Sequence, residues 1–161
     1  MALVAVPLAQ PIARLTGGLF GLWPQSLTML VLRITLAMPF WRAGGTDWDG
    51  WFTLSFGVKA RFADLTLHIL GKEYPLPNPD LMALGASLAE VILPALLVLG
   101  FATRYAALAL LIMTGVIQLT FPDGWREYHL PWAAMAMAIL TFGGGKVALD
   151  YVLGLDREPK R

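Results

Sequence analysis

The chain of 161 residues contains no cysteine. This absence excludes disulfides, thiol catalysis and cysteine-ligated zinc or iron–sulfur sites within it. Charged residues are also scarce, at 14% of the chain, against about 25% in ordinary soluble domains. The chain has two histidines, so we expect no metal site and no covalently bound cofactor of its own.

Excess charge of one sign is missing as well. The formal net charge is +1, which argues against a general electrostatic attraction to nucleic acid. No basic residue precedes the apolar start of the chain, and prolines at positions 7 and 11 interrupt the residues after it. These features do not fit a secretory signal peptide. We expect residues 1–25 to form a leader that rests at a membrane interface.

The chain is rich in apolar sequence, at 57% of its residues. A chain of this length cannot bury so much apolar surface in one core, so lipid is expected to cover part of it. Four long apolar runs, at about 27–43, 81–101, 104–121 and 128–143, have the length and composition of membrane-spanning helices. Small residues recur on their faces and permit close helix packing. The sequence therefore predicts an all-α integral membrane four-helix bundle.

The segment between the first two runs, residues 46–80, is too polar to span a membrane. Apolar residues recur there at helical spacing, and charged residues fall between them. This pattern predicts an amphipathic helix in the long first loop, lying on the membrane or capping the bundle. The apolar positions are Leu54, Val58, Phe62, Leu65 and Ile69.

Two charges lie well inside the predicted spans, Arg33 in the first and Glu90 in the second. A charge in lipid is costly and usually pairs with another or marks a functional site. We expect Arg33 and Glu90 to form an intramembrane polar pair. Pro94 removes the helical hydrogen bond to the carbonyl of Glu90, which adds a spare acceptor there. The pair either fixes the register of the helices or shapes a polar pocket for a quinone head group, a small polar molecule or protons.

Four further residues are candidates for that pocket: Thr35, Trp41, Gln118 and His129. Trp41 also suits an aromatic belt at the membrane surface, and this is the simpler interpretation. A haem held by His68 and His129 is a weaker alternative than interfacial or capping roles for these histidines. The sequence assigns no catalytic residue.

Several of these features together resemble the DoxX family of small four-span bacterial and archaeal membrane proteins. The resemblance covers roughly residues 28–151, within an expected four-span domain at 26–153 and before a polar tail at 154–161. Its motifs are Arg33 in the first span, Gly44-Gly45 at its end, the approach Tyr74-Pro75-Leu76-Pro77, Glu90 in the second span, Leu99-Gly100-Phe101-Ala102-Thr103-Arg104, and Gly143-Gly144-Gly145 leading to Leu149-Asp150.

This resemblance implies an integral membrane subunit, often of an oxidoreductase system that is quinone-linked or serves redox defence. Partner redox proteins would then supply the redox centres. We expect a multi-pass protein of the bacterial inner membrane with both termini in the cytoplasm. Six basic residues would then lie on that side, against five on the other. Two alternative functions remain open, a small transporter and a structural membrane anchor without catalysis. Assembly into a homo-oligomer also remains open.

Overall fold

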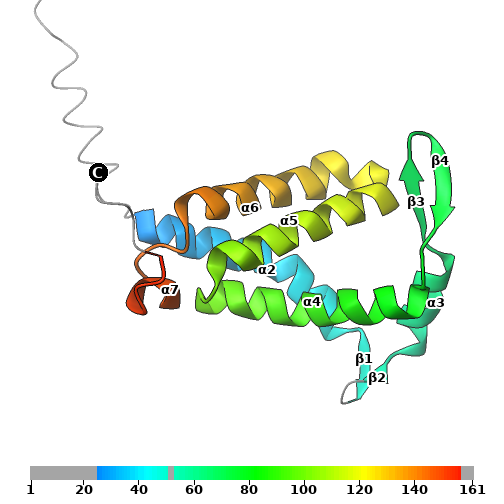
Figure 1. The fold of residues 1–161 in the computed structure, drawn as a ribbon, viewed down its shortest axis with the longest axis horizontal. Coiled ribbons are helices and arrows are strands. Elements are labelled where there is room, and N and C mark those ends of the chain that lie inside the picture. Colours follow the sequence, from blue (N-terminus) through cyan, green and yellow to red (C-terminus); the bar gives the residue numbers. More distant parts are fainter. Residues whose placement is uncertain (1–24, 51–52, 157–161) are drawn as a thin grey trace, which may run out of the picture.

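The computed structural model describes residues 25–50 and 53–156, and the expected leader lies outside this part of the chain except for Gln25. Four helices form most of it: α2 (Gln25–Gly45), α4 (Pro79–Leu99), α5 (Thr103–Thr120) and α6 (Leu130–Phe142). Figure 1 shows them running along the length of the molecule, with neighbours packed in the order α2, α4, α5, α6 and back to α2. The helices lie where the four apolar runs predict them, within about two residues at each end.

Two of these helices are long and apolar enough to cross a membrane by length and composition. They are α4, with a mean hydropathy of 2.1, and α5, with 1.3. Large apolar side chains remain exposed along both, including Ile92 and Ile112. Exposed apolar surface of this extent on a helix suits contact with lipid. The core between the helices is formed by small and branched side chains, such as Leu36, Ala107 and Ile139.

The segment between α2 and α4 corrects part of the sequence prediction. The expected amphipathic helix is present as α3 (Phe56–Asp64), capped by the hydroxyl of Ser55, but it does not continue to Ile69. Instead β3 (Thr66–Ile69) pairs in antiparallel register with β4 (Lys72–Pro75). Leu70 and Gly71 both have positive φ, 51° and 76°. A two-residue turn of this kind matches the twist of paired strands, and it overrides the helical periodicity.

A second small hairpin follows α2 directly and pairs β1 (Trp48–Gly50) with β2 (Thr53–Leu54). Both hairpins and α3 lie at one end of the molecule, here called the hairpin end (Figure 1). Two short helical turns, η1 (Pro122–Gly124) and η2 (Trp125–His129), connect α5 to α6. The last helix, α7 (Leu149–Val152), lies at the opposite end, here called the α7 end.

A buried carboxylate organises the α7 end. Asp150 accepts hydrogen bonds from the backbone N–H of Ala102 at 2.8 Å and from the N–H and hydroxyl of Thr103 at 2.7 and 2.6 Å. It therefore caps the first turn of α5, where backbone N–H groups lack helical partners and negative charge is favoured. This contact ties the C-terminal segment to the tight turn between α4 and α5.

We expect Asp150→Ala to destabilise the fold. The substitution leaves the N–H groups of Ala102 and Thr103 without their acceptor, and the free energy of unfolding should fall by roughly 2 kcal/mol or more. Thermal or denaturant unfolding of the purified protein measures the effect. Asp64→Ala is the matched control, since Asp64 is exposed at the end of α3. Equal stability of the two variants would contradict the capping role.

Candidate functional site

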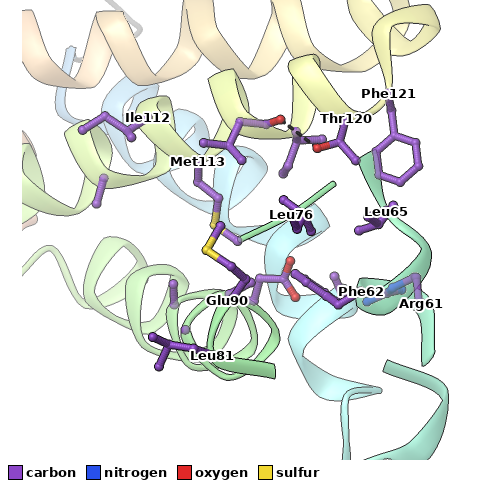
Figure 2. A pocket seen from close by; sticks show the side chains of 18 of the residues that line it. Arg61, Phe62, Leu65, Leu76, Leu81, Glu90, Ile112, Met113, Thr120 and Phe121 are labelled. Carbon is purple, nitrogen blue, oxygen red and sulfur yellow. Dashed lines mark hydrogen bonds between the residues drawn. The ribbon is translucent and has the colours of Figure 1, made fainter. Parts of the chain in front are cut away.

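The candidate site is a cavity of about 570 Å³ between α4 and α5, on the side where α3 closes the bundle. Its walls are mainly apolar. The α4 wall consists of small side chains and methionine (Met82, Gly85, Ala86, Ala89), and the α5 wall includes Ile112, Met113 and Val116. Phe62, Leu65, Leu76 and Phe121 close the hairpin end of the cavity (Figure 2). Glycine and alanine on α4 leave space that larger side chains would fill.

Polar groups enter this cavity at one place. Figure 2 shows the carboxyl group of Glu90 reaching from α4 toward Phe62 of α3, with Arg61 beyond it. The third polar lining side chain, Thr120, donates its hydroxyl to the carbonyl of Val116 on its own helix at 3.0 Å. The cavity thus has a long apolar section and a polar corner made by Glu90 and Arg61.

Glu90 belongs to a small polar cluster with Asp47, Arg61 and Ser87. Asp47 is only 2% exposed and accepts the hydroxyl of Ser87 at 2.6 Å. Its other carboxylate oxygen lies 3.5 Å from the guanidinium of Arg61. Glu90 stands three residues after Ser87 on the same face of α4 and lines the cavity together with Arg61. The cluster therefore contains two carboxyl groups and one guanidinium.

The backbone around Glu90 explains why α2 and α4 approach so closely there. A Cβ atom on Gly44 would lie 2.9 Å from the carbonyl carbon of Glu90 and 3.0 Å from its carbonyl oxygen. That oxygen has no helical N–H partner, because Pro94 stands four residues later. The contact therefore requires glycine at position 44. The α-carbon of Gly44 covers the free carbonyl oxygen of Glu90.

The structure does not bring Arg33 and Glu90 together as the sequence analysis expected. Arg33 lies next to Gly100, where an added Cβ would overlap Nη1 of the guanidinium. Glu90 lies next to Gly44 instead. The two helices are antiparallel, and Gly44 stands 11 positions after Arg33, which corresponds to about 16 Å of helix. The two charges therefore occupy different levels of the bundle, Glu90 toward the hairpin end and Arg33 toward the α7 end.

Arg33 is fully buried, and none of its guanidinium nitrogens has a hydrogen-bond partner within residues 25–50 and 53–156. The carboxylate that interacts with it electrostatically is that of Asp150, whose two oxygens are engaged at the start of α5. Asp150 thus supplies charge balance to Arg33. Ordered water is the usual partner of buried groups of this kind.

The other predicted pocket residues lie away from the cavity. Thr35 and Trp41 are exposed on α2, Trp41 to 51%. Gln118 and His129 do come together, with the amide oxygen of Gln118 2.6 Å from Nδ1 of His129. The ring of His129 also packs against Trp132, with ring centroids 5.5 Å apart. These two residues join α5 to the turn before α6 and do not line the cavity.

Three of the four residues of the cluster, Asp47, Arg61 and Ser87, were not predicted as site residues from the sequence. A signal for Ser87 was present, because residues three apart on a helix share a face, and Ser87 stands three before Glu90. Asp47 comes two residues after the glycines that end α2. Arg61 lies on the predicted amphipathic helix, but its position beside α4 depends on how the loop folds back.

A matched pair of variants tests the contact at Gly44. Gly44→Ala would place a methyl group against the backbone of Glu90, so α2 and α4 must separate, and we expect a clear loss of thermal stability. Gly45→Ala adds its methyl group where no atom lies within 4 Å and should leave the stability within about 0.5 kcal/mol. Unfolding curves of both variants in the same detergent measure the difference. Equal curves would show that the close contact is not required.

Comparison with known proteins gives two matches. The family model described as DoxX matches residues 28–123, more than half of the chain. A protein of Haemophilus influenzae described as an uncharacterized protein is 28% identical over 147 residues, which cover 80% of this chain and 85% of the relative. No solved structure matches.

Proposed function

The chain belongs to the DoxX family of membrane proteins, and from this premise we propose that it is the membrane subunit of an oxidoreductase system that binds a quinone in the cavity between α4 and α5. In this proposal α2, α4, α5 and α6 all span the bacterial inner membrane. Both termini lie in the cytoplasm, which places the hairpin end at the opposite surface.

The shape and polarity of the cavity support the quinone assignment. A volume of about 570 Å³ falls within the usual range for small-molecule sites, roughly 300–1,000 Å³. A quinone combines a ring bearing carbonyl oxygens with an apolar tail. The apolar walls of α4 and α5 suit the tail, and the polar corner at Glu90 and Arg61 suits the head group. This match between one polar corner and a long apolar section is the observation that carries the proposal.

In this function a partner protein carries out the electron transfer. The chain has no cysteine with which to hold an iron–sulfur cluster or to act as a redox thiol. Its own residues would position the head group, exclude water from it and keep the tail in an apolar environment. A partner redox subunit would then exchange electrons with the bound quinone.

Filling the cavity tests the binding site directly. Gly85 lines the cavity and a Cβ there meets no atom within 4 Å. Gly85→Leu should therefore occupy the space without disturbing the backbone. We expect the affinity for decylubiquinone to fall by about tenfold or more, a loss of about 1.4 kcal/mol or more. Saturable binding to protein in lipid nanodiscs, compared with empty nanodiscs, is the measurement.

Gly115→Leu is the matched control, since Gly115 on α5 is equally open but does not line the cavity. It should bind decylubiquinone as the wild type does. Absence of saturable binding by the wild type would overturn the quinone assignment. Transport of a solute into liposomes by the protein alone would favour the transporter alternative. If a strain that carries Gly85→Leu has the same phenotype as the wild-type strain, the cavity is not needed, and this result would favour a structural anchor.

The proposed orientation is tested separately. A green fluorescent protein fused after Arg161 should fluoresce in a bacterial host, because it folds in the cytoplasm. Alkaline phosphatase fused at the same place should be inactive, because it needs the oxidising periplasm. The reverse pattern would invert the topology and place the hairpin end in the cytoplasm.

A further inference from the structure

We propose that the α7 end carries a binding site for one anionic phospholipid, with the lipid phosphate beside Lys146 and the acyl chains over the apolar side chains around α7. The site is separate from the cavity between α4 and α5, and it does not depend on quinone binding. It lies at the surface that the proposed topology places in the cytoplasm, where the bilayer leaflet is rich in anionic lipids.

A second cavity, of about 670 Å³, lies between the start of α2 and the segment that follows α6. The backbone N–H of Lys146 donates a hydrogen bond to the hydroxyl of Ser26 at 3.2 Å, which holds this segment against α2. Figure 1 shows α7 close to the first turns of α2 at this end of the molecule. Polar and apolar side chains line the cavity together, among them Gln25, Ser26, Lys146, Tyr151, Val152 and Leu153.

The charges around this cavity leave one cation free. Asp156 also lines the cavity, but its two oxygens accept from the guanidinium of Arg104 at 3.1 Å and from the N–H of Gly144 at 3.2 Å. The ammonium group of Lys146 is exposed and has no ion pair within residues 25–50 and 53–156. Two cations and one carboxylate therefore leave one positive charge, which a phosphodiester would balance through charge-assisted hydrogen bonds.

The apolar part of the site is widely exposed. Val152 is 74% exposed, Leu155 67% and Leu153 59%. At the end of α6, Phe142 lines the same cavity and is also exposed, so this apolar surface is continuous with that of the long helices. Exposed apolar side chains next to a lysine are typical of segments that lie at the boundary between lipid head groups and acyl chains. These features favour a lipid over a protein partner as the occupant.

Native mass spectrometry of the full chain in detergent tests the site, with phosphatidylglycerol and phosphatidylcholine of identical acyl chains as probes. We expect the wild type to bind one phosphatidylglycerol more tightly than one phosphatidylcholine. Lys146→Gln should weaken phosphatidylglycerol binding by about fivefold, or about 1 kcal/mol, which is the usual contribution of one lysine near an anionic lipid surface. Its affinity for phosphatidylcholine should not change. Lys72→Gln is the matched control, because Lys72 is exposed on β4 at the hairpin end, and it should leave both affinities unchanged.

Three results would overturn the proposal. The first is equal affinity of the wild type for the two lipids. The second is an effect of Lys72→Gln as large as that of Lys146→Gln, because the attraction would then be general and not local. The third is displacement of the lipid by inorganic phosphate at millimolar concentration, which would indicate a site for free phosphate.

Spin labelling tests the position of α7 in the membrane independently. The chain has no cysteine, so Val152→Cys can be labelled without any other substitution. In liposomes that contain phosphatidylglycerol, a label at position 152 should meet oxygen more readily than a water-soluble nickel complex, as should a label on Ile92→Cys, an exposed position of α4. Lys72→Cys should give the reverse. A label at position 152 that behaves like the one at position 72 would contradict lipid contact, and so would one shielded from both reagents, because protein would then cover α7.

Discussion

The close contact of α2 with α4 at Gly44 sets the geometry of the whole site. A methyl group at that position would meet the backbone of Glu90 at 2.9 Å, so the two helices keep their spacing only with glycine there. The approach aligns Glu90 with the end of α2. Asp47, three residues beyond Gly44, is thereby brought beside Glu90, and its carboxylate meets Ser87 on α4. The polar cluster thus depends on one backbone contact that Pro94 makes favourable by freeing a carbonyl.

The sequence was sufficient to locate the four long helices and to identify the family. Apolar runs with at most two charges, bounded by glycine and proline, define such helices independently of their partners. It was not sufficient for the segment from Thr66 to Ile69, where helical spacing of apolar residues and strand formation compete. The turn at Leu70-Gly71, with both residues at positive φ, favours the hairpin. His68 then contacts the carbonyl of Leu119 on α5 at 3.3 Å, a tertiary contact that local patterns do not contain.

The two buried charges show a second limit of sequence reasoning. Arg33 and Glu90 are opposite in sign and both lie within apolar helices, so mutual pairing is the simplest expectation. Pairing also depends on the register of antiparallel helices, which composition does not specify. In the structure each of these two charged residues interacts with a different carboxylate from outside the long helices. Asp47 interacts with Glu90, and Asp150 interacts with Arg33. The residues that complete both environments follow helix ends, where sequence patterns carry little information.

The hydrogen bonds of Asp150 affect the order in which parts of the chain can fold during synthesis. The start of α5, at Ala102 and Thr103, obtains its cap from a residue about 47 positions later. Synthesis proceeds from the N-terminus, so α4 and α5 are made before their connecting turn has its acceptor. The turn becomes fixed only once the segment after α6 has been released from the ribosome. Closure of the bundle at the α7 end is therefore a late event in biogenesis, and chains that terminate before Asp150 would remain open at that end.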